Sequence, residues 1–189
     1  MRRKLFVLKA DYPPVPDSAV RSFWRDRKGA SFVEFAIIAI PLFLLFIGII
    51  EVGLIFWATY ELENATADAA RLVRTGQARS MTAATLKAGL CSEVVILSGC
   101  TTGVRINIQV FPGGFGTMTP ANPIDSSGKL ITTFNGDPSQ VGPGQDVLVT
   151  AYYEWPLADP LTQAVLSNLS DGNCLIRAAA AFRSEPFPG

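Results

Sequence analysis

The chain has 189 residues, with sixteen Lys and Arg balanced by sixteen Asp and Glu, and it contains no His. This length accommodates one domain and an anchor rather than two full domains. The lack of His removes the commonest general base and metal ligand, and three scattered Cys do not give the spaced pairs of a zinc site. With no other catalytic constellation above chance, we predict no enzyme activity and no catalytic, cofactor or metal site.

Charge is distributed unevenly along the chain. Residues 1–29 hold eight Lys or Arg against three Asp, whereas the other 160 hold eight basic and thirteen acidic residues. Basic residues beside a hydrophobic segment stay in the cytoplasm, so we predict a cytoplasmic N-terminus and an exported C-terminal part. Nucleic-acid binding by this cluster is disfavoured, because a membrane-length segment follows it and no recognition fold does.

The most apolar stretch is 28–60. It carries no charge over residues 35–50, and the apolar run resumes after Glu51. A bilayer core of about 30 Å needs about 20 mainly apolar residues in a helix, so this stretch predicts a membrane span. Glu34 and Glu51 lie within it, and a carboxylate in a membrane segment usually has both a partner and a function.

Two interpretations of the start of this stretch compete. A secretory signal would be cut beyond the apolar run, but the run is too long and residues 58–61 form a poor Ala-x-Ala site. A cut after Gly29 would instead make Ala30 the new N-terminus and keep the helix in the mature protein. Glu34 would then lie one helical turn from the new ammonium group and could pair with it in its own chain or a neighbour. The alternative is that Glu34 snorkels to the cytoplasmic interface.

Glu51 lies seventeen residues after Glu34, about 25 Å along a helix, which predicts a position near the outer boundary of the hydrocarbon. An interfacial carboxylate and a helix–helix contact explain Glu51 equally well, and Gly48 and Gly53 would let another helix approach. Pro41 is expected to kink the helix, because its ring removes a backbone hydrogen bond.

Helical periodicity continues past the membrane-length stretch, and Gly76 is a plausible terminator, so we predict one helix from about Ser31 to about Thr75. After it we expect a helical segment at 80–97, strands at 104–110, 129–134, 146–155 and 174–183, and a short helix or turn at 160–169. The predicted fold class is therefore α+β, a long N-terminal helix followed by a small head with an antiparallel sheet. The predicted organisation is a leader at 1–29 that is cleaved off, a membrane helix at 30–60, its continuation outside the membrane at 61–79, and an exported α+β domain at 80–189.

A family resemblance begins at the proposed cut. The sequence KGASFVEF, residues 28–35, resembles the processing site of type IV prepilin-like proteins. Together with Pro41, the run GIIEVG at 48–53 and the C-terminal segments VTAYYEWPL and LIRAAAAFRSEPF, it resembles the TadE-like pseudopilins of tight adherence (Flp) pilus systems. One departure is Phe35, where many relatives have Tyr.

The resemblance implies a minor pseudopilin of the inner membrane with a pilin-like shape and its C-terminal domain in the periplasm. A prepilin peptidase would cut between Gly29 and Ala30, and Glu34, Phe35 and Glu51 would make subunit contacts. The implied role is in assembly of a Flp-type pilus or related secretion apparatus. The implied partners are the membrane, the peptidase and other pilin-like or pilus-assembly proteins, with no nucleic acid and no small-molecule substrate.

Two alternative functions remain open from the sequence. One is a secreted binding domain released by signal peptidase near residue 60, and the other is a single-pass subunit of an unrelated envelope complex, uncut at Gly29. For the cysteines, proximity in sequence and similarity to TadE-like relatives favour a disulfide between Cys91 and Cys100. Cys174 is then left over, and pairing of Cys100 with Cys174 is the alternative.

Overall fold

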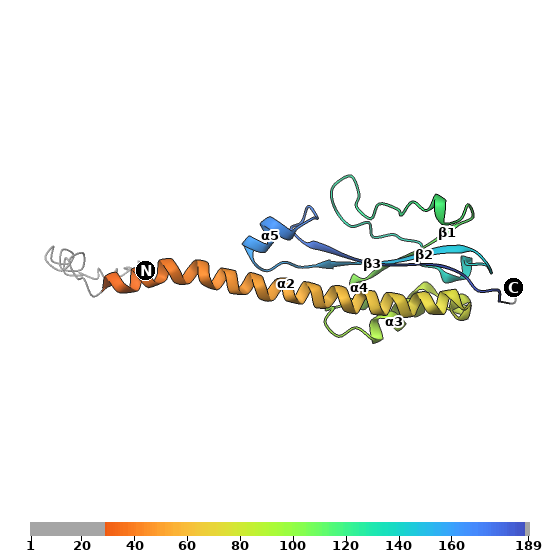
Figure 1. Cartoon of the computed structure of the whole chain (residues 1–189), viewed down its shortest axis with the longest axis horizontal. Coiled ribbons are helices and arrows are strands. Elements are labelled where there is room, and N and C mark those ends of the chain that lie inside the picture. The colour runs from red at the N-terminus through yellow and green to blue at the C-terminus, as the bar shows by residue number, and fades with distance from the viewer. Residues whose placement is uncertain (1–28, 188–189) are drawn as a thin grey trace, which may run out of the picture. The chain divides into compact units, whose positions relative to one another are not determined.

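The structure is a computed structural model that describes residues 29–187, so the basic leader predicted at 1–28 lies outside the described residues. The chain divides into two compact units, Met1–Phe43 and Leu44–Gly189. Helix α2 spans Ala30–Arg74 (Figure 1). It contributes residues to both units. Its bounds agree to within one residue with the helix predicted from Ser31 to Thr75.

The described part of the first unit, 29–43, consists almost entirely of the start of α2. Its large apolar side chains are exposed, including those of Phe32, Ile37 and Phe43. Pro41 lies inside the helix, which continues through it without a break in assignment. The expected kink at this proline stays a prediction.

The second unit is built on a three-stranded antiparallel sheet in the order β1-β2-β3. The strands are β1 (Arg105–Phe111), β2 (Asp146–Trp155) and β3 (Cys174–Arg183). The sequence predicted β2 and β3 with these bounds and placed β1 one residue too early. Together with the long helix, the sheet confirms the α+β fold class.

The C-terminal half of α2 packs on one face of this sheet. The buried residues of the helix recur at spacings of three and four, which places them along one side. They share a hydrophobic cluster with inward-facing residues of the strands. On the helix these are Ala58, Leu62, Ala65, Ala69 and Val73, and on the sheet Ile106, Ile108, Val147, Val149 and Ala151. Most of the helix residues are alanines, whose small side chains let the helix backbone approach the sheet.

The opposite face of the sheet is covered by the long connection between β1 and β2 (Figure 1). Phe134 from this connection stacks on Tyr152 of β2, with ring centroids 5.1 Å apart, and Tyr152 is fully buried. The strand predicted at 129–134 is wrong, because only an isolated bridge between Ile124 and Leu130 forms there. A carboxylate oxygen of Asp125 accepts hydrogen bonds from the backbone N–H groups of Ser127 and Lys129, which closes a tight turn instead of extending a strand.

The remaining helices are short. They are η2 (Gln77–Ser80), α3 (Ala83–Ser92), α4 (Cys100–Gly103), η3 (Phe115–Thr117), η4 (Pro138–Gln140) and α5 (Pro160–Leu166). The helical segment predicted at 80–97 is therefore shorter than expected and ends at Ser92. Gly76 ends α2 as predicted, with a φ of 76°, and a Cβ at this position would lie 2.6 Å from the ring of Phe187.

Candidate functional site along the apolar helix

The predicted cleavage and assembly residues lie at the start of α2. Gly29 is exposed and directly precedes the helix, which begins at Ala30, so the predicted cut falls at the helix N-terminus. Glu34 and Phe35 are exposed in the first turns of the helix. Ala30 and Glu34 are four residues apart on a helix, so the carboxylate lies one turn from the ammonium group that a cut would create.

The N-terminal part of α2 has the length and composition of a membrane span. Its most apolar 18-residue window has a mean hydropathy of 2.7, and only 6% of that window is buried within the chain. The core helix of a soluble protein is mostly buried, so this value argues against that explanation of the apolar run. An apolar helix surface left open in its own chain needs lipid or another helix as its partner.

Glu51 has its partners inside the chain. Its side chain is only 7% exposed, and its two oxygens accept hydrogen bonds from the Ala158 N–H at 2.7 Å and the Thr162 hydroxyl at 2.5 Å. The sequence left open an interfacial carboxylate or a helix–helix contact for this residue. The structure shows a contact with the segment that leads from β2 into α5, which lies 107 to 111 residues further along the chain.

Local sequence explains why α5 presents the Thr162 hydroxyl to Glu51. Asp159 is the N-cap of the helix, accepting a hydrogen bond from the Thr162 N–H at 3.2 Å, and Pro160 takes the first helical position. Thr162 therefore lies in the first turn, facing α2. A Cβ at Gly48 would lie 3.6 Å from the Thr162 methyl group, so the glycine faces α5 at ordinary contact distance. Gly53, by contrast, has open space where a Cβ would be, so only Gly48 faces a described neighbour.

A second carboxylate of α2, Glu61, holds the loop between α3 and α4. One of its oxygens accepts hydrogen bonds from the backbone N–H groups of Val95 and Ile96, each at 3.0 Å. Glu61 was not singled out from the sequence, so this contact was missed. The signal for it in the sequence was weak. Backbone N–H groups in a loop have no acceptors from regular secondary structure, so they need acceptors from elsewhere.

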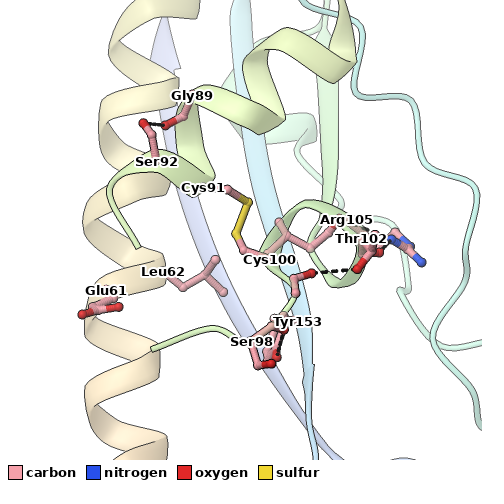
Figure 2. The surroundings of a disulfide bond; sticks show 12 residues. Glu61, Leu62, Gly89, Cys91, Ser92, Ser98, Cys100, Thr102, Arg105 and Tyr153 are labelled. Atoms are coloured by element: carbon pink, nitrogen blue, oxygen red, sulfur yellow. Dashed lines mark hydrogen bonds between the residues drawn. A yellow bond between two sulfur atoms is a disulfide. The ribbon is translucent and has the colours of Figure 1, made fainter. Parts of the chain in front are cut away.

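The disulfide between Cys91 and Cys100 is confirmed, with a Cα–Cα distance of 5.7 Å (Figure 2). It joins the last turn of α3 to the start of α4, and so closes the loop that Glu61 holds. The Tyr153 hydroxyl donates a hydrogen bond to the Ser98 carbonyl oxygen at 2.8 Å in the same loop (Figure 2). Partial burial raises the pKa of Tyr153 above its ordinary value, which keeps the phenol protonated as a donor.

Cys174 is a free thiol, as predicted, at the start of β3. Partial burial raises its pKa, so it stays a weakly reactive thiol at neutral pH. Over residues 29–187, no group of three His, Cys, Asp or Glu side chains is arranged to hold a metal ion. The Ser126 and Lys129 side chains, which formally match a Ser-x-x-Lys motif, are exposed on the turn around Asp125.

Comparison with protein families gives a match in this part of the chain. Residues 29–71 match the family model of TadE-like proteins. The matched segment is less than half of the chain, and it contains Gly29, Glu34, Phe35, Glu51 and most of the helix that packs on the sheet. Comparison with curated proteins and with solved structures finds no match. The TadE-like segment indicates a role in tight adherence pilus systems, and it confirms the resemblance drawn from the sequence.

Proposed function

We propose that the protein is a minor pseudopilin-like component of tight adherence pilus assembly, anchored in the inner membrane and cut between Gly29 and Ala30 by a prepilin peptidase. The observation that carries this proposal is the exposed apolar start of α2, which lies within the TadE-like match. Glu34 is the only charge in the stretch 29–50. The protein would act as a substrate of processing and a structural subunit rather than as an enzyme.

The proposed mechanism uses the charge at the start of the helix. Cleavage would create an ammonium group on Ala30, one turn from Glu34, in a low-dielectric region where an unpaired carboxylate is costly. The carboxylate of one subunit would pair with the ammonium of its neighbour, and this pairing would fix the position of one apolar helix beside the next. The head, defined as residues 75–187, would then contact other pilin-like proteins on the periplasmic side.

The contacts of Glu51 count against release by signal peptidase near residue 60. Such a cut would remove Glu51 from its donors, the Ala158 N–H and the Thr162 hydroxyl, and would remove Ala58, which is fully buried in the core of the second unit. The released domain would therefore lose part of its own packing. An uncut single-pass subunit of another envelope complex keeps these contacts and remains the competing function.

A set of charge variants in the native host tests the proposal. Glu34→Ala and Glu34→Gln should both abolish incorporation into the pilus assembly, measured by co-purification with other pilus proteins, while the protein stays in the membrane fraction. Glu63→Ala is the matched control, because Glu63 is an exposed carboxylate on the part of α2 that packs on the head. Normal assembly of Glu34→Ala, or an equal loss with Glu63→Ala, would contradict the proposal.

A further inference from the structure

The surface around α5 is apolar on its outer side. The helix Pro160–Leu166 contains no charged residue, and Leu161 and Val165 are 51% and 74% exposed. These two residues are four apart, so they lie on the same side of the helix. With α2 they form an open groove of about 320 Å³ in which Thr162 is the only polar side chain. The lining residues are Leu45, Gly48, Ile49, Val52, Leu161, Thr162, Val165 and Leu166.

The position of α5 along α2 places this surface beside the apolar run. The helix residues that line the groove lie between 45 and 52, and Glu51 is the only charged residue from 35 to 60. A span of about 20 residues counted from Phe35 ends near Leu54. The α2 residues beside α5 therefore belong to the last part of the span, on the side of the membrane where the head lies.

The hydrogen bonds of Glu51 lower the free-energy cost of placing its carboxyl group near the end of the membrane span. Unsatisfied polar groups are expensive in a membrane, and each oxygen of Glu51 has a donor from the β2–α5 segment. The same bonds hold α5 against α2. A second apolar hollow lies on the other side of Glu51, where Trp155 and Pro156 approach Leu54. Tryptophan is enriched at membrane interfaces, so its place here agrees with an interfacial depth.

We propose that α5 is an interfacial membrane element, inserted in the head-side leaflet at the boundary between headgroups and acyl chains, with Leu161 and Val165 against lipid. This inference rests on the proposed membrane anchoring of α2 and adds a second point of attachment for the head. Helices with one apolar face that lie in the interface bury that face about 5–10 Å into the boundary region. The head is thereby held against the membrane surface. Its distance from the bilayer is set by the position of Glu51 on α2, because the Glu51 hydrogen bonds fix α5 at that level of the helix.

Site-directed spin labelling of the full chain in phospholipid vesicles tests this depth. The vesicles contain palmitoyl-oleoyl phosphatidylethanolamine with phosphatidylglycerol as the minor component, at a low protein-to-lipid ratio. Cys174→Ser leaves no free thiol among the described residues, because Cys91 and Cys100 are bonded to each other. Single labels are then attached through Val165→Cys on α5, Ile38→Cys in the span and Val95→Cys on the α3–α4 loop, where Val95 is 86% exposed.

Oxygen concentrates in hydrocarbon, whereas a charged nickel chelate stays in water. We expect the oxygen-to-nickel accessibility ratio at positions 165 and 38 to be several-fold higher than at position 95. Leu161→Cys provides a second label on α5 and should agree with position 165.

Three results would overturn the inference, each in a different way. A water-like accessibility ratio at position 165 with a lipid-like ratio at position 38 would mean that α5 lies in water although α2 spans the membrane. Water-like ratios at both positions would instead remove the proposed anchor itself. Dipolar broadening between labels at 165 would show that a second copy of the chain, rather than lipid, covers this surface.

Discussion

The two ends of α2 follow different packing rules although they belong to one helix. The first end, 30–43, carries large apolar side chains all round, and these are exposed. The second end, 58–74, has an apolar stripe dominated by alanines that is buried against the sheet, with charged residues on the other sides. A stripe of small residues suits close packing on a sheet, whereas large side chains on every side suit lipid or neighbouring helices. The difference separates the part of the helix that folds with the head from the part that needs an external partner.

The same substitution, Leu to Ala, should have different consequences at the two ends of α2. Leu62→Ala removes a fully buried side chain and should cost about 2–5 kcal/mol of head stability. Leu42→Ala, on the exposed end, should leave head stability unchanged. Chemical unfolding of the full chain in detergent micelles, followed by near-ultraviolet circular dichroism, measures both. Equal losses would mean that the two ends are not distinct.

Removing the disulfide should affect only the head. The Cys91→Ser, Cys100→Ser double variant opens a loop with a sequence separation of 9 and should lower the free energy of unfolding by about 2–3 kcal/mol on the chain-entropy model. Cys174→Ser is the matched control, because this thiol has no bond to lose. The same unfolding measurement separates them, and a comparable loss for both variants would argue against the assigned pairing.

Glu51 lies between the exposed end of α2 and the end that packs on the sheet, and its hydrogen bonds join α2 to α5. Glu51→Ala removes the acceptor of the Ala158 and Thr162 donors and should cost about 1–3 kcal/mol. Glu51→Gln keeps one acceptor oxygen and should cost less. The rate of amide hydrogen exchange in α5 measures how far this helix is destabilised when the Glu51 hydrogen bonds are lost. If exchange of α5 were unchanged in Glu51→Ala, the contact would not hold this helix in place.

The smallest expected effect lies far from the helix, in the turn around Asp125. Hydrogen bonds from the Ser127 side chain and then the Lys129 backbone hold the pKa of this carboxyl below its ordinary value of 3.8. A lowered pKa contributes stability above the unfolded value, and this contribution is lost as pH falls through the folded value. The protection of the Ser127 and Lys129 amides, measured against the intrinsic exchange rate at each pH, should therefore fall only below about pH 3.8, while α2 stays protected. A loss of protection that began well above this pH would contradict the assignment.

Local patterns in the sequence were sufficient for most of the fold. The β-branched and aromatic run at 146–155 predicts β2 with its observed bounds, because nothing in that run favours another structure. Gly76 marks the end of α2 because a left-handed residue is needed there. The prediction of a strand at 129–134 was wrong, because this run forms only one bridge, between Ile124 and Leu130 across the turn made by Asp125.

The functional contacts were harder to predict, because their partners are distant in sequence. The pattern around Glu51 showed that this carboxylate needs a partner, but no local spacing points to Ala158 and Thr162. Glu61 was hidden in the same way, since its acceptor function depends on backbone N–H groups of a loop. Backbone donors have no signature in the identity of the residue that carries them.

Processing after Gly29 and retention of the apolar helix are tested most directly by the N-terminal residue and intact mass of the protein extracted from the membranes of its native host. We expect a chain that begins at Ala30, which would establish the cut after Gly29 and leave the exposed apolar end of α2 at the mature N-terminus. A full-length chain in the membrane would contradict processing and favour an uncut anchored subunit. A soluble fragment beginning near residue 61 would contradict the anchor as well.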